Sequence, residues 1–523
     1  MKKQPLLILS AITLFCLAIN AHAAPKTKSP GAPAGQAEIP SPLPETTPAS
    51  TSPAPVAANA PLKMTTATLG KINHLFFGSN FIHTLKNKPD LADGKIEALA
   101  KNLPLTLLRY PGGTVADNFH WTTTTLDNPA RFPRMTPADA PNMITFDDFM
   151  AFCARTGAEP MLVVNTESWA LRNDIPGGIK EAADWVRYCK TKNSKVKYWE
   201  IGNETYWHPI MTAREYGALV KRYSQAMKAV DPTIIISANG HWDKDHVGVK
   251  EQFPRDQWTP ARQRVLSITT AKQDGENNAY VKDMRAHHNT RSAESWWNDV
   301  LEECGQDIDM LSVHWYFKKN AVAQIDANLA ALMKFSKARS GRDYLLCMSE
   351  YNSNSENEVN GWCLAEGVCR MFNGGVKLAT FWPLLGNGES ARRGMITNDD
   401  RKAPRYPWQI FKMLGDNLDG DIIKCTGTDT LFMFATKSPE QITLVVTARG
   451  NDKLSATEGD CDIAFDPDAA KGKVTSVCSL ATDKTATLHL TKPSYTLKSN
   501  GMTLRITPGA FTMIIIKRQG ISN

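Results

Sequence analysis

The segment Lys197–Glu204 is rich in aromatic and β-branched residues, which favour a β-strand, and it ends in Gly-Asn-Glu. Gly202 stops the strand and lets the backbone approach a ligand closely. Glu204 then lies at the carboxyl end of the strand, where catalytic side chains project in a (β/α)8 barrel. We therefore predict that Glu204 acts as a general acid/base. The alternatives are that Asn203 and Glu204 form a solvated loop, or that Glu200, inside the strand, is the reactive carboxylate.

Other apolar segments also end in polar side chains, and each end is a candidate for the same site. Because residues two apart in a strand share a face, His314 and Tyr316 can point at one ligand. Glu350 ends the segment after theirs, so a second carboxylate is expected at the same end of the barrel as Glu204. The polar residues at these strand ends are Arg109, Asn165, His314, Tyr316 and Glu350.

Two carboxylates that flank a sugar ring are the groups that glycoside hydrolysis requires. One protonates the leaving oxygen, and the other attacks the anomeric carbon. Arg109 can hold the attacking carboxylate ionised, and Tyr316 can donate a hydrogen bond to it. Asn203 is placed to bond the sugar 2-hydroxyl, a contact that strengthens in the transition state.

Each supporting residue also has a purely structural interpretation. Arg109 could be a salt-bridge residue that lines a barrel, and Asn165 and Trp382 could simply finish their strands. We nevertheless assign these three residues to substrate binding. Asp117 and Glu167 are carboxylates near the same end, and we interpret them as loop residues or contacts to neighbouring sugars.

Short apolar segments alternate with helical patterns from Ile72 onward, and this alternation predicts the fold that carries these residues. Strands buried on both faces read as continuous apolar runs, and eight strand-helix alternations favour a TIM barrel over an open sheet. The absence of G-x-G-x-x-G after the first strand also argues against a dinucleotide-binding fold. The predicted strands are His74–Gly78, Leu105–Tyr110, Pro160–Asn165, Lys197–Gly202, Thr233–Asn239, Asp309–Tyr316, Tyr344–Glu350 and Val376–Trp382. Helices are predicted around Ile179–Cys189, Tyr216–Val230 and Trp362–Phe372.

The pattern changes after about Lys412, where short apolar runs alternate with Gly, Asp, Asn and Pro turns. This pattern predicts an antiparallel β-sandwich, to which residues 62–71 could add a strand. We expect a signal peptide over 1–23, a Pro/Ala/Ser/Thr-rich linker over 24–61, the barrel over 62–412 and the sandwich over 413–523. The connection from His241 to about Ser295 is too long for a plain barrel loop. Four tryptophans either line a cleft or pack the insertion onto the barrel: Trp242 and Trp258 within it, and Trp296 and Trp297 just beyond it.

The amino-terminal segment has the features of an export signal. A basic start, an apolar core over Leu6–Ile19 and an A-x-A site at Ala21–Ala23 predict a cleaved signal peptide, so the protein is expected to be secreted or periplasmic. The apolar run is too short for a confident transmembrane helix. The following residues lack large apolar side chains and are expected to form an extended tether.

Composition excludes several other classes of protein. The 523 residues are 42% hydrophobic and carry a formal charge of +7 without a basic block, so nucleic-acid binding is not indicated. Without Cys16 there are nine scattered cysteines and no C-x-x-C pair, so neither a zinc site nor a disulfide scaffold is supported. No metal or cofactor is expected, and the oligomeric state is left open.

Four segments together carry a resemblance to a known family: Leu108–Gly113 with Ala116–Trp121, Glu181–Tyr188, Tyr198–Glu204 and Ser312–Tyr316. They resemble the α-L-arabinofuranosidases of glycoside hydrolase family 51, within the clan of retaining barrel enzymes with catalytic Glu on strands four and seven. Gly-Asn-Glu is shared across the clan, and its combination with Arg-Tyr-Pro-Gly-Gly is more specific. The resemblance runs from about Leu75 to Asn417, and a trailing β-sandwich also suits the family.

The resemblance implies that Glu204 is the acid/base and Glu350 the nucleophile, with Arg109, Asn203, His314 and Tyr316 around them. This chain departs from the family's pattern at two places, and both bear on which sugar is bound rather than on the retaining mechanism. The family's first strand carries a Glu that binds arabinose hydroxyls, where this chain reads Phe77–His83 without a carboxylate. The nucleophile lies in Ser-Glu-Tyr-Asn instead of Asp-Glu-Trp-Asn.

The expected activity is that of a retaining α-L-arabinofuranosidase acting on an oligo- or polysaccharide. A β-xylosidase, an endo-glucanase or a uronic-acid-directed glycosidase of the same clan is the alternative within this class. The other class is a non-catalytic carbohydrate-binding protein on a decayed barrel. Retention of both glutamates together with Arg109, His314 and Tyr316 argues against such decay.

Overall fold

The computed structural model describes eleven stretches of the chain, and everything below concerns these residues. They are 61–81, 88–127, 142–206, 211–242, 293–353, 361–386, 394–397, 399, 402–450, 456–482 and 488–519. All of them belong to one compact unit, which spans Val56–Asn523. The predicted signal peptide and the linker to residue 60 lie outside the described residues and stay predictions.

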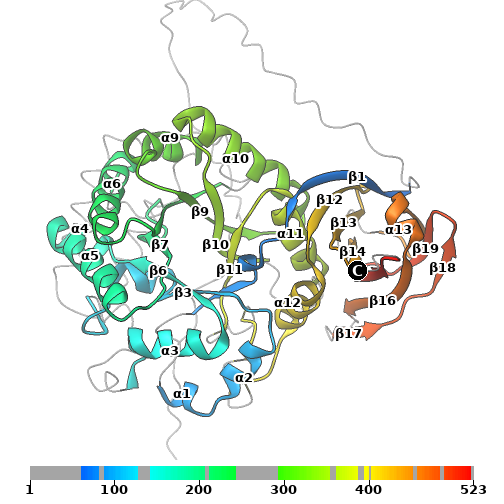
Figure 1. The fold of residues 1–523 in the computed structure, drawn as a ribbon, viewed down its shortest axis with the longest axis horizontal. Coiled ribbons are helices and arrows are strands. Elements are labelled where there is room, and N and C mark those ends of the chain that lie inside the picture. Colours follow the sequence, from blue (N-terminus) through cyan, green and yellow to red (C-terminus); the bar gives the residue numbers. More distant parts are fainter. Residues whose placement is uncertain are drawn as a thin grey trace, which may run out of the picture. The chain divides into compact units, whose positions relative to one another are not determined.

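Eight parallel strands close into a barrel, as the alternation of elements predicts (Figure 1). Each strand pairs with the next one along the chain, and the last pairs with the first, so the barrel has no open edge. The sequence order of the strands is therefore their order around the barrel, and β7 and β10 are its fourth and seventh strands. The barrel strands are β2 (Gly78–Asn80), β3 (Leu107–Tyr110), β6 (Glu159–Val164), β7 (Tyr198–Ile201), β8 (Ile235–His241), β9 (Met310–Phe317), β10 (Leu345–Ser353) and β11 (Leu378–Phe381).

The first barrel strand begins later than predicted. Residues His74–Phe76 form a 3-10 turn instead of a strand, because the Oδ1 of Asn73 accepts the N–H of Leu75 and caps the turn. Strand β2 then occupies Gly78–Asn80, so Asn80 and not Gly78 marks its carboxyl end.

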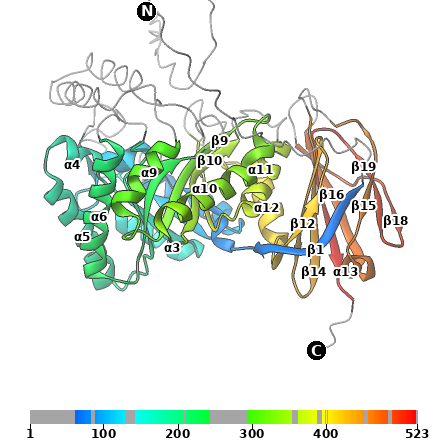
Figure 2. The ribbon, with the colours of Figure 1, turned by 90° about the horizontal axis from the view of Figure 1, so that it is seen from above.

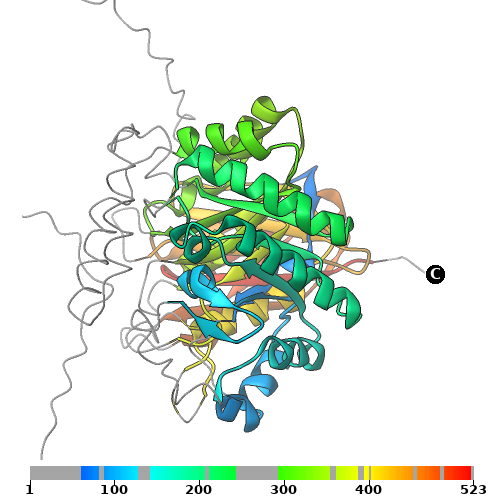
Figure 3. The same cartoon turned by 90° about the vertical axis from the view of Figure 1, so that its left-hand side faces the viewer.

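Helices cover the outside of the barrel, and the three predicted ones are present with somewhat wider bounds. Figure 2 shows α5, α6, α9 and α10 along the outer face, and Figure 3 shows the cyan to green helices running alongside one another. Capping boxes begin two helices, where Thr145 and Thr212 each exchange bonds with the acidic residue three positions on. The helices are α1 (Lys88–Ala92), α2 (Lys95–Lys101), α3 (Phe146–Thr156), α4 (Glu167–Leu171), α5 (Ile175–Thr191), α6 (Ala213–Val230), α9 (Ala293–Cys304), α10 (Ile325–Ser340), α11 (Gly361–Asn373), α12 (Tyr406–Asn417) and α13 (Pro467–Lys471).

The second region is one curled sheet of ten strands, antiparallel except where β1 pairs with β15. Strand β1 comes from before the barrel and pairs with β12, so residues 62–71 do add a strand to this sheet. Alternating side chains of its strands, such as Leu444 and Val446, fill an apolar core. The strands are β1 (Leu62–Lys71), β12 (Asp421–Thr426), β13 (Leu431–Lys437), β14 (Gln441–Ala448), β15 (Gly459–Ala464), β16 (Lys473–Thr482), β17 (Leu488–Thr491), β18 (Tyr495–Lys498), β19 (Gly501–Ile506) and β20 (Phe511–Lys517). A separate short hairpin joins β4 (Phe119–His120) and β5 (Thr125–Leu126).

Three of the four tryptophans around the long insertion pack inside the protein. Trp296 and Trp297 of α9 are fully buried, and their indole N–H groups donate to the carbonyls of Asn239 and His241 at 3.0 and 3.1 Å. Trp242 is buried and lies 5.4 Å from the ring of Phe335. These three tryptophans therefore pack α9 and the end of β8 within the protein rather than line a cleft, while Trp258 lies outside the described residues. None of the described helices is both long and apolar enough to cross a membrane.

Candidate active site

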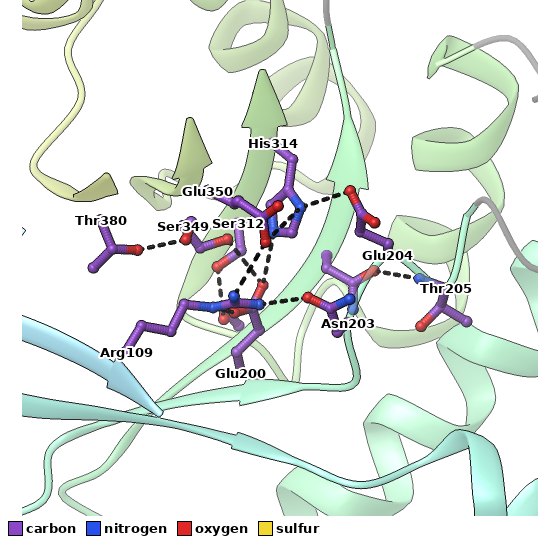
Figure 4. Close-up of polar contacts among 12 residues, drawn as sticks. Arg109, Glu200, Asn203, Glu204, Thr205, Ser312, His314, Ser349, Glu350 and Thr380 are labelled. Atoms are coloured by element: carbon purple, nitrogen blue, oxygen red, sulfur yellow. Dashed lines mark hydrogen bonds and ion pairs between the residues drawn. The ribbon is translucent and has the colours of Figure 1, made fainter. Parts of the chain in front are cut away.

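The carboxyl ends of the barrel strands bring most of the predicted site residues together (Figure 4). Arg109 comes from β3, Asn203 and Glu204 follow β7, and His314 lies on β9. Glu350 comes from β10, across the barrel from Glu204. Figure 4 shows the imidazole of His314 between these two carboxylates. Such an end of a (β/α)8 barrel is where enzymes of this fold carry their reactive groups.

Glu204 lies in a sharp turn that ends strand β7. Gly202 has φ = 72°, and Glu204 itself has φ = 46°. A glycine takes this left-handed conformation without cost, whereas a residue with a side chain does so rarely. The turn lifts the Glu204 side chain out of the sheet, so that it keeps 23% of its surface exposed.

A β-bulge sets the direction of Glu350. Met348 pairs with Val313 on β9, but Glu350 pairs with the very next residue, His314, so Ser349 is the extra residue in the ladder. A bulge re-aims the side chains that follow it. Here it places Glu350 beside His314, while the hydroxyl of Ser349 donates to Glu200 at 3.0 Å.

The guanidinium of Arg109 is fully buried and holds three neighbours in place. Its Nε donates to Glu200 Oε2 at 2.6 Å, Nη1 to Asn80 Oδ1 at 2.9 Å and Nη2 to Asn203 Oδ1 at 2.9 Å. Nη1 also lies 3.5 Å from Glu350 Oε2. A buried cation is tolerated only with such full pairing, so Arg109 orients Asn203 as well as the predicted nucleophile.

Glu204, His314 and Glu350 form a compact group. The Nδ1 of His314 lies 3.1 Å from Glu204 Oε1 and 3.7 Å from Glu350 Oε2. One oxygen of each carboxylate and a nitrogen of His314 all lie within 4.8 Å of one another. These are also atoms that bind metal ions, but the cationic Arg109 beside Glu350 opposes a second cation there.

Burial and neighbouring charges raise the pKa values of Glu350 and His314. Burial raises the pKa of Glu350 to about 7, and Glu204 adds to the rise, against His314, Arg109 and the hydroxyl of Tyr316, which lower it. For His314, burial lowers the pKa, but the carboxylates of Glu350 and Glu204 outweigh it and the net pKa is raised. The two glutamates therefore favour the charged form of the imidazole.

Three buried polar atoms of the site residues lack a hydrogen-bond partner among the described residues: Oε2 of Glu350, Nδ2 of Asn203 and Nε2 of His314. Tyr316 donates its hydroxyl to Glu350 Oε1, which leaves Oε2 without a donor. Asn203 accepts from Arg109 through Oδ1, and its Nδ2 donor is unused. At the carboxyl end of the barrel, such atoms are available to hydrogen-bond a ligand.

The other two predicted binding residues are Asn165 and Trp382, whose contacts are with other parts of the barrel. Asn165 caps the end of β6, where its amide donates to Ser168 Oγ at 2.6 Å and to the Phe119 carbonyl at 3.4 Å. Trp382 follows β11, is partly exposed and packs against Gly113, where an added Cβ would lie 2.4 Å from the indole. Their roles in binding stay predictions, and the bonds of Asn165 favour its structural interpretation.

Sequence reasoning missed several polar residues that hold the site. Glu200 is fully buried against Arg109, so substrate cannot reach it as an alternative acid. Asp117 and Glu167, interpreted as loop residues or contacts to neighbouring sugars, are both buried; Glu167 begins helix α4, and Asp117 Oδ1 accepts the N–H of Asn203 at 3.0 Å. Asn80 and Asn239 were not singled out. The signal for them was an asparagine at the end of an apolar strand, the same signal that identified Asn165.

A barrel with two glutamates at the carboxyl end of its strands is typical of glycoside hydrolases, and known proteins similar to this chain belong to that class. The family model of the Alpha-L-arabinofuranosidase 1 domain matches residues 99–287, which is less than half of the chain. The chain is 29% identical over 161 residues to an intracellular exo-alpha-(1->5)-L-arabinofuranosidase of Acetivibrio thermocellus. It is 31% identical over 166 residues to alpha-L-arabinofuranosidase C of Emericella nidulans. These alignments cover 28% and 27% of this chain, and 32% and 30% of the relatives' own length, so the chain spans about a third of the curated relatives that it matches.

Solved structures extend the likeness of fold over most of the chain. A family 51 alpha-L-arabinofuranosidase from Bifidobacterium longum superposes with a TM-score of 0.63 at 14% identity, covering 87% of this chain and 100% of that one. An alpha-L-arabinofuranosidase from Thermotoga maritima gives 0.61 at 17% identity, with coverage of 87% and 99%. A family 44 xyloglucanase from Paenibacillus polymyxa gives 0.56 at 15%, also covering 87% and 99%. The TIM barrel and the likeness to family 51 are thus confirmed.

Proposed function

We propose that this protein is a retaining glycoside hydrolase that cleaves its substrate by double displacement, with Glu350 as nucleophile and Glu204 as acid/base. The observation that carries the proposal is the approach of the two carboxylates to within 4.8 Å across the carboxyl end of the barrel. Retaining enzymes place their carboxyl groups roughly 5–5.5 Å apart, and inverting enzymes roughly 6.5–9.5 Å. The short approach supports the retaining arrangement, since inversion requires a wider separation that admits a water.

In the first step, the Oε2 of Glu350 attacks the anomeric carbon while Glu204 gives its proton to the leaving oxygen. Tyr316 occupies Oε1 of Glu350, so the other oxygen is the one available for the new bond. In the second step, Glu204 takes a proton from water, and that water displaces Glu350 from the sugar. His314, positioned between both carboxylates, stabilises whichever of them is ionised.

Asn203 supplies a contact that strengthens as the sugar approaches the transition state. Its carboxamide is oriented by Arg109 through Oδ1, so the unused Nδ2 donor points to a fixed place in the site. A hydrogen bond from this donor to the sugar 2-hydroxyl fits the proposed mechanism. Trp382 offers a partly exposed indole as a surface for the sugar ring.

For the substrate, we propose an α-L-arabinofuranosyl side chain of a polysaccharide. The partial sequence likeness to arabinofuranosidases supports this choice. The fold itself also accommodates a xyloglucanase, and the chain lacks the first-strand carboxylate expected for arabinose hydroxyls. A β-xylosidase, endo-glucanase or uronic-acid-directed activity is therefore the second candidate. We also propose that the protein is exported through residues 1–23.

A panel of nitrophenyl glycosides tests the proposed activity, followed by NMR of the first product formed from the best substrate. We expect release of nitrophenol from the α-L-arabinofuranoside and a product with the anomeric configuration of the substrate. A first product of inverted configuration would refute the double displacement. Hydrolysis of another glycoside alone would keep the mechanism and change the substrate. A folded protein that binds sugars without turnover would establish the non-catalytic class instead.

A further inference from the structure

The proposed acid/base depends on an unfavourable backbone conformation. Glu204 has φ = 46°, and this left-handed conformation is unfavourable for a residue with a side chain. Such conformations persist only where the surrounding structure over-determines them. The contacts that hold the turn from Ile201 to Thr205 therefore decide where the Glu204 carboxyl lies.

Asn239, on the neighbouring strand β8, bonds both sides of this turn. Its Oδ1 accepts the N–H of Thr205 at 3.1 Å, directly after Glu204. Its Nδ2 donates to the carbonyl of Ile201 at 2.8 Å, directly before Gly202. One fully buried carboxamide thus spans the turn that carries Glu204.

Asn239 is itself held by the buried hydroxyl of Tyr216 on α6. The hydroxyl accepts from the backbone N–H and from the Nδ2 of Asn239, both at 2.8 Å, and donates to the Ile201 carbonyl at 2.7 Å. This uses the one donor and two acceptor sites of a phenol. The carbonyl of Asn239 accepts from Trp296, whose ring stacks on Tyr216 with centroids 5.4 Å apart. These contacts hold the side chain of Asn239 in the orientation that bonds the Glu204 turn.

We propose that Asn239 is a positioning residue for Glu204: its carboxamide fixes the turn between Ile201 and Thr205 so that the acid/base reaches the leaving oxygen. The inference rests on the proposed function of Glu204. Asp117 holds the opposite side of the turn through the N–H of Asn203. Asn239 touches neither Glu204's carboxyl group nor the place of the sugar, so it acts through the backbone alone.

Two variants on the same strand test the inference. Asn239→Ala removes both bonds to the turn, whereas Ser237→Ala is the matched control. Ser237 is equally buried on β8 and shares a hydrogen bond with Ser312 at 2.9 Å, but it does not contact the turn. Each protein is assayed with an alkyl glycoside, which needs protonation to leave, and with an activated aryl glycoside, which needs little.

A misplacement of about 1 Å can cost on the order of 100-fold in rate. For Asn239→Ala we therefore expect kcat/KM to fall about 100-fold with the alkyl glycoside and less than about 10-fold with the aryl glycoside. For Ser237→Ala both rates stay near the parental ones. If Asn239→Ala does not fold, Tyr216→Phe provides the milder variant, because it removes one partner of Asn239 and should show the same selectivity to a smaller degree.

Equal loss with both substrates, or behaviour like that of the Ser237 control, would overturn the inference. Melting temperatures of the variants guard against general destabilisation as the cause, because unfolding lowers both rates together. If the parental protein hydrolyses no glycoside, it is the proposed function that fails, before any variant is compared.

Discussion

The Nε of Arg109 lies 2.6 Å from Oε2 of Glu200, whereas the closest approach of Arg109 to Glu350 is 3.5 Å. The sequence had suggested that Arg109 serves the nucleophile. In the structure its charge is shared first with Glu200 of β7, which lies two strands along the barrel from β3. Arg109 therefore compensates only part of the burial of Glu350, whose pKa is raised to about 7.

Replacing Glu200 with Gln should shift the pH profile of the reaction toward acid. The change removes one negative charge near Glu350 and leaves the charge of Arg109 uncompensated, so the pKa of Glu350 falls. We expect the acid limb of kcat/KM to move down by about one pH unit. Ser349→Ala is the control, because it removes a hydrogen bond to Glu200 but no charge. An acid limb that stays in place, or moves up, would contradict this role of Glu200.

Glu350→Gln should abolish turnover and at the same time stabilise the fold at alkaline pH. The folded pKa of Glu350, about 7, lies above the unfolded value of about 4.3, so the ionised form is less favourable in the folded protein. Stability from this group is complete below about pH 4 and is lost as the pH rises toward and past 7. The neutral Gln avoids that loss, with a gain on the order of 1 kcal/mol or more at pH 8.

Urea unfolding of the parental protein and the Glu350→Gln variant, each at pH 5 and pH 8, measures this effect. The advantage of the variant should grow between the two pH values. Near-parental turnover by the folded variant would remove Glu350 as nucleophile, and a constant stability difference would remove the raised pKa.

Seven of the eight barrel strands were predictable because each is an apolar run that ends in a turn, whereas the first, Gly78–Asn80, is short and polar and was predicted too early in the chain. The catalytic end of the barrel followed from the polar residue after each run, as with Glu204 and Glu350. The same continuity hides which face of a strand looks inward, so the sequence could not show that Glu200 faces Arg109. Strand β18 shows the opposite mismatch: its residues Tyr-Thr-Leu-Lys alternate between apolar and polar, yet all four are exposed, so the alternation does not mark a buried face.

Details of register were beyond the sequence as well. The bulge at Ser349, which turns Glu350 toward His314, exists only through pairing with β9. The hydrogen bonds from Asn239 to both sides of the Glu204 turn depend on Tyr216, which lies on helix α6. Both features arise from contacts between elements far apart in the chain. They cannot be predicted from a single sequence in which the strand register is unknown.

His120 gives the fold a second pH dependence, away from the two glutamates. Its Nδ1 lies 2.8 Å from Glu181 and its Nε2 lies 2.9 Å from Asp127. Burial lowers the pKa of His120, but these hydrogen-bonded carboxylates outweigh it and raise the pKa to about 9. Because the unfolded value is about 6.5, this stabilisation is complete below pH 6.5 and is lost as the pH rises through 9.

His120→Gln should therefore be less stable than the parental protein at pH 6, by on the order of 2 kcal/mol once partial solvent access is allowed for. The difference should shrink at pH 9.5. Unfolding free energies at the two pH values measure it, and parallel pH curves for the two proteins would show that His120 does not carry the charge.

The exported form should begin near Ala24, because Ala21–Ala23 offers the small residues of a cleavage site. Amino-terminal sequencing of protein from the native host checks this, and an intact Met1 would refute it. Removal of residues 24–61 by limited proteolysis should leave the activity unchanged, because this segment has too little apolar content to pack.

Glu204→Ala tests the acid/base assignment itself. Without its proton donor the first step should slow strongly for alkyl glycosides and much less for activated aryl glycosides, which leave without protonation. The second step also loses its base, so the glycosyl-enzyme on Glu350 should accumulate. Added azide, which needs no base, should enter the space left by the removed side chain and release the sugar as a glycosyl azide. Attack on the intermediate inverts the configuration a second time, so the azide product should keep the configuration of the substrate.

A matched Glu200→Ala variant lacks such a space beside the sugar, because Glu200 is fully buried under Arg109. Azide rescue of that variant, or equal loss of both substrates in Glu204→Ala, would assign the proton transfer to another group.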